Sequence, residues 1–250
     1  MMRKVIGLLS GFLFSVSLTL LVLILLASSL TAYEISKEVF TTLLANTLKR
    51  QMNPQQLEQT YQQVSAYCKS NQNFTLPMMN ENITMDCQAI LATNSSYLVY
   101  LLAEKFFDGL YYKSYGCDFL TCLQGLKSAE DAIIFFSSTS HEFFKSSVWP
   151  VILLNVVIGI ALLLSIEDWP GRCKAFGLQF LFIGVFFFLV PYLKSFTLDR
   201  LPPEAAIAEN LLDKIFELIS PILLVFFVAG IVLIGIWLGN KFLMKKQKPK

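Results

Sequence analysis

Long runs of uncharged, mostly apolar residues dominate the chain. Their lengths are 29, 21, 19 and 23 residues, and they occupy 5–33, 146–166, 175–193 and 218–240. An α-helix needs roughly 20 apolar residues to cross the hydrocarbon core of a bilayer. The runs lack the alternation of a membrane β-barrel, so helices satisfy their backbone hydrogen bonds in lipid. We therefore predict four transmembrane helices, at about 5–28, 147–166, 175–194 and 218–240.

The composition agrees with this prediction. Hydrophobic residues make up 55% of the chain and charged residues 15%, and phenylalanine alone occurs 22 times. A soluble domain carries about 25% charged residues. The low charge, concentrated between the apolar runs, excludes a soluble enzyme, a nucleic-acid-binding protein and a disordered chain. We predict an all-α integral membrane protein.

Basic residues near the ends of the predicted spans indicate the orientation, because Lys and Arg are enriched on the cytoplasmic side. With the N-terminus inside, the inner segments hold nine basic and two acidic residues, whereas 33–147 holds eight and eleven. We therefore predict cytoplasmic termini in a protein of the cell membrane. The predicted domains are an N-terminal span at 1–32, an exported helical domain at 33–146 and a three-span membrane domain at 147–250.

The first span also has the arrangement of a secretory signal peptide, since Arg3 and Lys4 precede its apolar run. This run is longer than the 7–15 residues of a typical signal core, which favours a retained span. Small residues recur every four positions in it, and a similar pair lies in the fourth span. Small residues on one helix face let another helix approach closely. The predicted packing residues are Gly7, Gly11, Ser15, Thr19, Gly235 and Gly239.

Apolar residues in the exported domain recur at helical spacing. Asn53 followed by Pro54 predicts a helix start, because the Asn side chain caps the helix and Pro fits its first turn. Ser128 and Asp131 have the spacing of a capping box for a further helix. Pro150 is expected to interrupt the helix that leads to the second span. The predicted helices cover about 35–48, 54–68, 96–113 and 128–144, and a polar loop covers about 69–84.

Four of the five cysteines fall in the exported domain, where an oxidising compartment favours disulfides. They are Cys68, Cys87, Cys117 and Cys122, whereas Cys173 lies in a predicted cytoplasmic loop. Four cysteines allow three pairings. We favour Cys68–Cys87 and Cys117–Cys122, because each bond closes a short loop between predicted helices. The expected role of both bonds is to stabilise the fold.

Thiol–disulfide exchange by Cys117 and Cys122 is the enzymatic alternative. Reactive pairs of this kind usually have two residues between the cysteines, a spacing that lowers the pKa of one thiol. Here four residues intervene, and Asp118 disfavours a thiolate beside it. The structural interpretation of the pair is therefore preferred.

Three Asn-x-Ser/Thr sequons lie within the exported domain, which predicts a glycoprotein if the host glycosylates. Their asparagines are Asn73, Asn82 and Asn94. The sequons cluster in and beside the predicted polar loop, which favours exposure to solvent.

The predicted spans contain few groups that suit transport or catalysis. They lack internal ionisable residues, which transporters and proton relays usually place at membrane depth. Asn155 and Gln179 are polar residues within spans, and we expect them to form hydrogen bonds between helices. A pore lined by these residues in an oligomer is the alternative. We expect no catalytic residues, cofactor, metal or nucleic-acid partner.

Two segments flank the fourth span. Residues 203–217 combine apolar positions at a spacing of four with acidic ones, which predicts an amphipathic helix on the outer leaflet or a polar extension of the span, with Pro221 as a separator of the two. The basic tail is expected to attract anionic lipid headgroups. Its lysines are Lys241, Lys245, Lys246, Lys248 and Lys250.

Together these features predict a non-catalytic membrane protein whose exported domain serves interaction, sensing or assembly. The expected partners are the lipid bilayer and either another protein or further copies of the chain.

Overall fold

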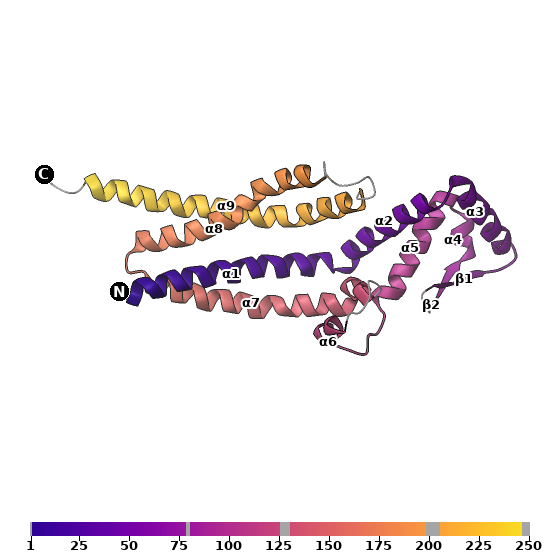
Figure 1. Cartoon of the computed structure of the whole chain (residues 1–250), viewed down its shortest axis with the longest axis horizontal. Helices are drawn as coiled ribbons and strands as arrows, with labels where there is room; N and C mark the ends of the chain where they lie inside the picture. The colour runs from indigo at the N-terminus through magenta and orange to yellow at the C-terminus, as the bar shows by residue number, and fades with distance from the viewer. Residues whose placement is uncertain (1, 79–80, 126–130, 199–205, 247–250) are drawn as a thin grey trace. The chain divides into compact units, whose positions relative to one another are not determined.

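The computed structural model describes residues 2–78, 81–125, 131–198 and 206–246. The chain divides into two compact units (Figure 1). The first, the membrane unit, comprises Met1–Ala27 and Phe144–Lys250. The second, the stapled unit, comprises Ser28–Phe143 and contains both disulfides.

Four long helices build the membrane unit, and α1 and α7 both continue into the stapled unit. Their bounds are Met2–Leu30 for α1, Ser138–Ser165 for α7, Trp169–Leu198 for α8 and Ala206–Lys246 for α9. In the described part of the chain, three helices are long and apolar enough to cross a membrane, at Ile6–Leu30, Ser138–Ser165 and Asp213–Phe242. The predicted span 175–194 lies within α8, although the side chains of 187–188 and from 190 onward are outside the described set. The third predicted span, at 175–194, therefore stays a prediction.

The core of the membrane unit forms where apolar faces of all four helices meet. Phe14, Leu18 and Val22 are buried on one face of α1, because positions four apart share a helix face. They pack with Leu162, Ile183 and Leu223 from the other helices. Phenylalanine rings continue this core: the ring centroid of Phe14 is 5.2 Å from that of Phe176, in an edge-on arrangement. Dispersion contacts of this kind, rather than expulsion of water, favour helix association in lipid.

Two prolines lie inside helices that we expected them to divide. Pro150 lies within α7 and Pro221 within α9. From Ala206 onward, the predicted amphipathic segment is the first part of the continuous helix α9, and residues 203–205 lie outside the described chain. A proline removes one backbone hydrogen bond. The helices continue because ending them would leave several more backbone groups without partners.

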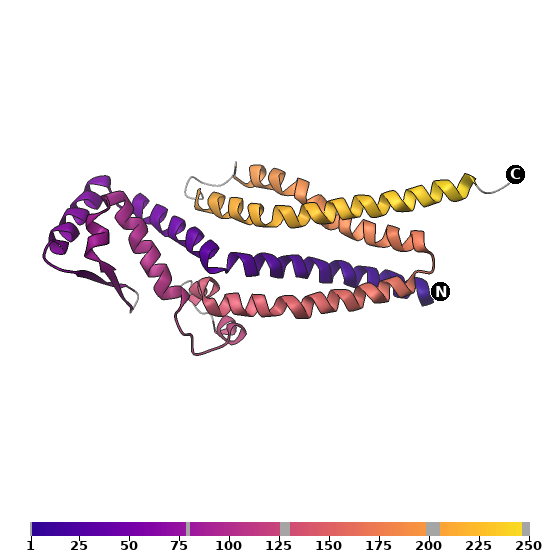
Figure 2. The same cartoon turned by 180° about the vertical axis from the view of Figure 1, so that it is seen from behind.

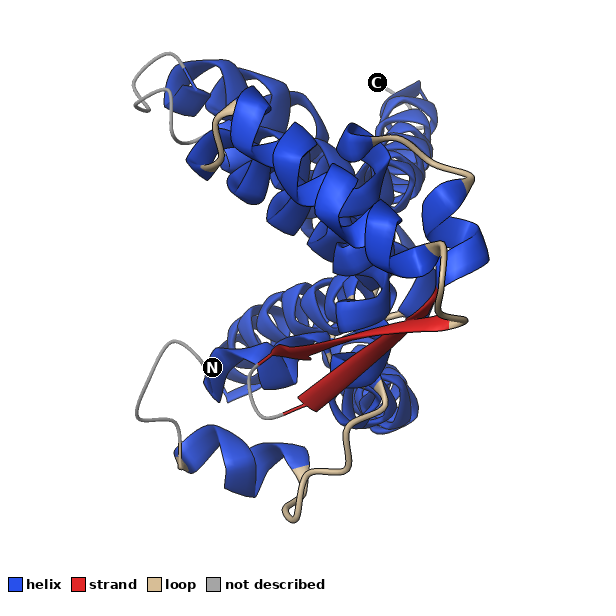
Figure 3. Ribbon diagram, turned by 90° about the vertical axis from the view of Figure 1, so that its right-hand side faces the viewer, coloured by secondary structure: helices blue, strands red, loops and turns tan. Residues whose placement is uncertain are grey.

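The stapled unit is mainly helical and contains one β-hairpin (Figures 2 and 3). Its elements are α2 (Tyr33–Gln51), α3 (Pro54–Cys68), β1 (Asn73–Met78), β2 (Glu81–Asp86), α4 (Cys87–Leu91), α5 (Ser95–Tyr111), α6 (Phe119–Gln124) and the 3₁₀ helix η1 (Asp131–Phe136). The predicted helices at 35–48, 54–68 and 96–113 are confirmed as α2, α3 and α5. The predicted helix at 128–144 is instead η1 followed by the start of α7, and Ser128 is outside the described residues.

The start of α3 has the capping geometry that the sequence predicts. The Asn53 side chain accepts a hydrogen bond from the backbone N–H of Gln55 at 3.2 Å, and the Gln56 side chain accepts one from the backbone N–H of Asn53 at 3.2 Å. Pro54 occupies the first helical position. These contacts satisfy backbone donors that a helix start otherwise leaves free.

The prediction of an irregular loop at 69–84 is wrong, because β1 and β2 form an antiparallel hairpin there. Phe74 pairs with Met85, and Leu76 pairs with Ile83. These four side chains share one face of the hairpin, and Ile83 and Met85 are buried in the core of the unit. In sequence, these few alternating apolar residues among polar ones resemble a loop. They form a strand pair because the apolar face of the hairpin packs against the helices of the unit.

Candidate functional site

Both favoured cysteine pairings are confirmed. Cys68 pairs with Cys87, with Cα atoms 4.9 Å apart, and Cys117 pairs with Cys122, with Cα atoms 5.6 Å apart. Cys173 is a free, buried cysteine of the membrane unit. The pairings therefore follow the division of the chain into its two units.

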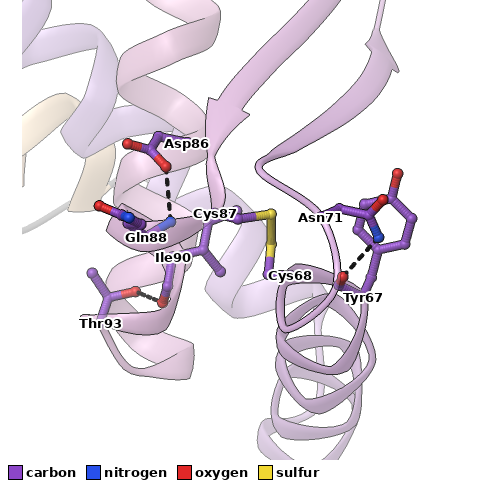
Figure 4. The surroundings of a disulfide bond; sticks show 8 residues. All are labelled: Tyr67, Cys68, Asn71, Asp86, Cys87, Gln88, Ile90 and Thr93. Carbon is purple, nitrogen blue, oxygen red and sulfur yellow. Dashed lines mark hydrogen bonds between the residues drawn. A yellow bond between two sulfur atoms is a disulfide. The ribbon is translucent and has the colours of Figure 1, made fainter.

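The Cys68–Cys87 bond joins the end of α3 to the start of α4, at the point where β2 turns into a helix (Figure 4). The Asp86 side chain caps α4 by accepting a hydrogen bond from the backbone N–H of Gln88 at 2.8 Å. Asn71 donates its side-chain N–H to the carbonyl of Tyr67 at 2.9 Å. Both cysteines are buried, and their surroundings are fixed by these caps. The bond therefore holds the end of β2, the end of α3 and the start of α4 in one arrangement.

The Cys117–Cys122 bond closes a short loop at α6. Asp118 precedes α6, and its carbonyl accepts a hydrogen bond from the backbone N–H of Cys122 at 2.9 Å. The Asp118 carboxylate adjoins the pair in sequence and opposes the formation of a thiolate. This arrangement favours a structural bond.

An ion pair connects α2 to α5 in the stapled unit. Lys37 Nζ lies 2.6 Å from Glu104 Oε1 and 3.9 Å from Asp108 Oδ1. Tyr33 donates its hydroxyl to Asp108 Oδ1 at 2.6 Å and accepts a hydrogen bond from Lys37 Nζ at 3.2 Å. We call Tyr33, Lys37, Glu104 and Asp108 the α2–α5 network. Each of its charged groups has an opposite charge or a hydrogen-bond partner.

The α2–α5 network raises the pKa values of its lysine and its tyrosine, so both groups keep their protons. The hydrogen bond to Glu104 raises the pKa of Lys37 above its ordinary value, against the opposing effect of burial. The hydrogen bond to Asp108 raises the pKa of Tyr33. A lysine or tyrosine that serves as a base needs a lowered pKa. The network is therefore suited to stabilising the two helices.

Three tyrosines gather where α2 begins and α5 ends. We call Tyr33, Tyr111 and Tyr112 the tyrosine cluster. The ring centroid of Tyr33 is 5.1 Å from that of Tyr111 and 5.7 Å from that of Tyr112. Tyr111 is buried and donates its hydroxyl to the carbonyl of Thr31 at 3.2 Å; burial raises its pKa. Tyr112 is 66% exposed. The cluster therefore exposes the ring of Tyr112, which packs against the rings of Tyr33 and Tyr111.

The three sequon asparagines are exposed, and two of them share a surface. Asn73 and Asn82 lie on the hairpin face opposite the core, where the hydroxyls of Thr75 and Thr84 are 3.3 Å apart. Asn94 caps α5 by accepting a hydrogen bond from the backbone N–H of Tyr97 at 2.9 Å. The hairpin therefore has a polar outer face that carries two complete sequons.

The predicted small-residue face of α1 packs over only part of its length. A Cβ atom on Gly7 would lie 3.3 Å from Ser165 Oγ, and one on Gly11 would lie 3.6 Å from Gln179 Nε2. Ser15 is half-buried, and Thr19 is exposed with its hydroxyl donated to the carbonyl of Ser15. Each step of four residues turns the position by about 40° around the helix, so the pattern leaves the packed face.

The Gly235 and Gly239 positions of α9 have open space in front of them, whereas other glycines form its contact with α8. Nothing lies within 4 Å of a Cβ built on Gly235 or Gly239. A Cβ on Gly184 would overlap the backbone of Phe227, and one on Gly230 would lie 2.7 Å from the backbone nitrogen of Leu181. The close helix contact therefore depends on Gly184 and Gly230, which the sequence pattern did not indicate.

Asn155 and Gln179 lie in separate places in the membrane unit. Asn155 donates its side-chain N–H to the carbonyl of Ser17 at 3.1 Å, which confirms the predicted bond between helices. Its Oδ1 and the hydroxyl of Ser17 are buried without a hydrogen-bond partner. Gln179 instead lines a cavity of about 710 Å³ together with Gly11 and Ser165. Within a single chain, Asn155 and Gln179 therefore do not line a common pore.

Two lysines, Lys174 near the start of α8 and Lys241 near the end of α9, lie against one tryptophan. The ring centroid of Trp237 is 5.1 Å from Lys174 Nζ and 5.3 Å from Lys241 Nζ. Lys241 belongs to the predicted headgroup-binding tail. The side chains of Lys245 and Lys246, and all of Lys248 and Lys250, lie outside the described set. The sequence gives no sign of the contact between Lys174 and Trp237, because the two residues are more than 60 positions apart.

Comparison with protein-family models, with curated proteins and with solved structures found no match. Function is therefore inferred from the chain's own geometry. Within the described residues, no three His, Cys, Asp or Glu side chains gather as metal ligands would.

Proposed function

We propose that the chain is a non-catalytic membrane protein that presents residues 33–146 on the exported side of the cell membrane as an interaction domain. The observation that carries this proposal is the tyrosine cluster. Tyr112 is largely exposed, while Tyr33 and Tyr111 hold its ring from behind. Tyrosine is enriched at the energetic centres of protein interfaces, because a rigid ring buries a large area at low entropic cost.

The α2–α5 network supports the same assignment. It lies beside the tyrosine cluster through Tyr33, which belongs to both sets. A surface whose side chains are already fixed loses less conformational freedom when a partner binds. The chemistry of the site therefore fits an aromatic and hydrogen-bonding partner surface on another protein.

The sequon at Asn94 lies at the opposite end of α5 from the tyrosine cluster. Asn94 caps the first turn of this helix and Tyr111 is its last residue. Seventeen residues at 1.5 Å each extend about 25 Å. A glycan on Asn94 would therefore leave the tyrosine cluster uncovered. Shifts in electrophoretic mobility after glycosidase treatment, lost one at a time in Asn→Gln variants, test this arrangement and the exported location together.

Site-specific crosslinking tests the interaction surface. A photoreactive amino acid replaces Tyr112 in the full-length protein in its native membrane. The same residue at Tyr97, which is 52% exposed at the other end of α5, is the matched control. We expect a defined crosslinked partner from position 112 and none from position 97.

Two results would contradict the proposal. One is equal crosslinking from both positions. The other is a monomer without any partner after purification in mild detergent, combined with no crosslink from position 112. Where a partner is captured, Tyr112→Ala should weaken its binding by roughly 30-fold, as expected of a central interface residue.

The four-span arrangement with cytoplasmic termini belongs to this proposal. Three apolar helices support it, as does the packing of α1 residues Phe14 and Leu18 in the core of the membrane unit, which favours a retained first span. The basic residues of the tail and of the 167–174 segment support the predicted orientation.

A further inference from the structure

Trp237 of α9 has a lysine ammonium group near its ring from each of two helices. Lys174 of α8 and Lys241 of α9 both lie within 5.3 Å of the ring centroid. The two ammonium groups are therefore no further apart than the sum of those two distances. An indole ring attracts a cation through the negative charge of its face. It brings two like charges together without neutralising either of them.

Among the described residues, these lysines have no acidic counter-charge. Neither Lys174 nor Lys241 forms an ion pair with an acidic side chain in the described part of the chain. Lys37 in the stapled unit, by contrast, has Glu104 at 2.6 Å. Two uncompensated cations around one ring repel each other, and an anion between them would reverse the sign of that interaction.

The location indicates what kind of anion is available. Trp237 and Lys241 lie at the end of the candidate span Asp213–Phe242. Tryptophan and lysine at a helix end are typical of the boundary between hydrocarbon and headgroups. One turn earlier, Leu233 lines an apolar pocket of about 290 Å³, together with Cys173 and Phe176 of α8. The anion that reaches the lysines would therefore be attached to an apolar chain.

We propose that Lys174, Lys241 and Trp237 form a binding site for the phosphate of an anionic bilayer phospholipid. The lysines supply the opposite charge, and the indole ring keeps both ammonium groups at the headgroup level. The pocket at Cys173 and Leu233 accommodates the upper part of an acyl chain. This site requires only that α8 and α9 are inserted in a bilayer. It is independent of the interaction domain, so either proposal can fail while the other stands.

Quenching of Trp237 fluorescence by brominated lipids tests the site directly. The full-length protein with Trp149→Phe and Trp169→Phe retains Trp237 as its sole tryptophan. It is reconstituted in phosphatidylcholine bilayers that contain either brominated phosphatidylglycerol or brominated phosphatidylcholine at equal mole fraction. We expect stronger quenching by the anionic lipid. Lys174→Gln and Lys241→Gln should each lower this preference about five-fold, which corresponds to about 1 kcal/mol per lysine near a charged surface.

Two control variants separate a defined site from general attraction to basic residues. Lys145→Gln removes an exposed lysine of α7, about 30 Å along the helix from Ser165, and should leave the preference unchanged. Replacing Lys245, Lys246, Lys248 and Lys250 by Gln should also preserve it.

Equal quenching by the two lipids would overturn the proposal. So would a preference that survives both Lys174→Gln and Lys241→Gln, or one that disappears only in the tail variant. Equal thermal unfolding temperatures of the variants establish that a lost preference reflects lipid binding rather than misfolding.

Discussion

In the membrane unit, α8 and α9 approach each other backbone to backbone at Gly184, whereas covalent and ionic side-chain contacts join the elements of the stapled unit. The membrane unit brings Gly184 of α8 against the backbone of Phe227 and buries few polar groups. The stapled unit is crossed by two disulfides and by the ion pair between Lys37 and Glu104. The difference follows the predicted surroundings of each unit. Lipid gives little hydrophobic force between helices, so close approach matters, whereas an oxidising aqueous compartment permits covalent and ionic links.

Loss of the Cys68–Cys87 bond should have the largest effect, and it should be confined to the stapled unit. The bond closes a loop with a sequence separation of 19. Cys68→Ser together with Cys87→Ser should lower the free energy of unfolding by about 3 kcal/mol, because the unfolded chain regains the entropy of the open loop. Limited proteolysis during a thermal ramp measures the effect by the release of fragments from residues 28–143.

Cys173→Ser is the matched control, because Cys173 is unpaired and buried in the membrane unit. Equal destabilisation by both changes would mean that the two units do not differ as described. The second pair tests the redox alternative: Cys117→Ser should trap no mixed disulfide with another protein, and a trapped one would establish thiol exchange.

A side chain at Gly184 should destabilise the membrane unit by about 2 kcal/mol, within the range of overpacked cores. The added Cβ of Gly184→Ala would overlap the backbone of Phe227, which cannot rotate away. Gly239→Ala is the control, since nothing lies within 4 Å of its Cβ position. The unfolding temperature in detergent, followed by loss of the monodisperse peak in size-exclusion chromatography, gives the comparison. Equal effects would show that α8 and α9 do not meet at Gly184.

Removal of the Lys37 ammonium should cost about 1 kcal/mol, since the ion pair is partly exposed. In Lys37→Met the stapled unit loses its contact with Glu104. Lys105→Met, which affects a more exposed lysine 3.8 Å from Asp108, should cost a smaller amount. Chemical denaturation followed by tyrosine fluorescence measures both.

The same lysine predicts the behaviour at alkaline pH. The folded pKa values of Lys37 and Tyr33 are raised above the ordinary values of 10.5 for lysine and 10.0 for tyrosine. Their stabilising contribution is therefore complete below pH 10 and is lost as the pH rises further, while the unfolded chain deprotonates first. The free energy of unfolding of the stapled unit should fall above pH 10, and Lys37→Met should reduce this fall. An equally steep fall in the variant would contradict the assigned contacts.

The smallest effect is expected at Asn155. Asn155→Leu removes one hydrogen bond to the carbonyl of Ser17 and also an unpaired buried oxygen. Polar contacts between membrane helices contribute about 0.6 kcal/mol on average, so the unfolding temperature in detergent should change by no more than a few degrees. A large loss of stability would show that polar side chains, rather than the Gly184 contact, hold the membrane unit.

The sequence predicted the parts of the fold that local signals determine. Asn53 and Pro54 mark the start of α3 through contacts with their immediate neighbours in sequence. The spacing of Cys68 and Cys87 likewise fits a short closed loop. Other features depend on a partner far along the chain. Gly184 of α8 and Gly230 of α9 are distinguished from other glycines only by the close approach of the opposite helix to each of them. Trp237 likewise gains its two lysines only once α8 and α9 are paired.

The hairpin was missed for a different reason. Its outer face is as polar as a loop, and only Phe74, Leu76, Ile83 and Met85 alternate with that face. Four apolar residues in two short segments do not distinguish a strand pair from an irregular turn until a helical surface is present to cover them.

The core of the membrane unit has a consequence for synthesis. Phe14, Leu18 and Val22 leave the ribosome before all of their partners, because the whole of 28–143 separates α1 from the rest of the unit. At about 5–20 residues per second, α1 waits on the order of ten seconds for α7 to α9. In the proposed topology, the stapled unit crosses the membrane, forms Cys68–Cys87 and completes its own fold during that interval. The order of translation therefore separates the two folding events in time as well as in place.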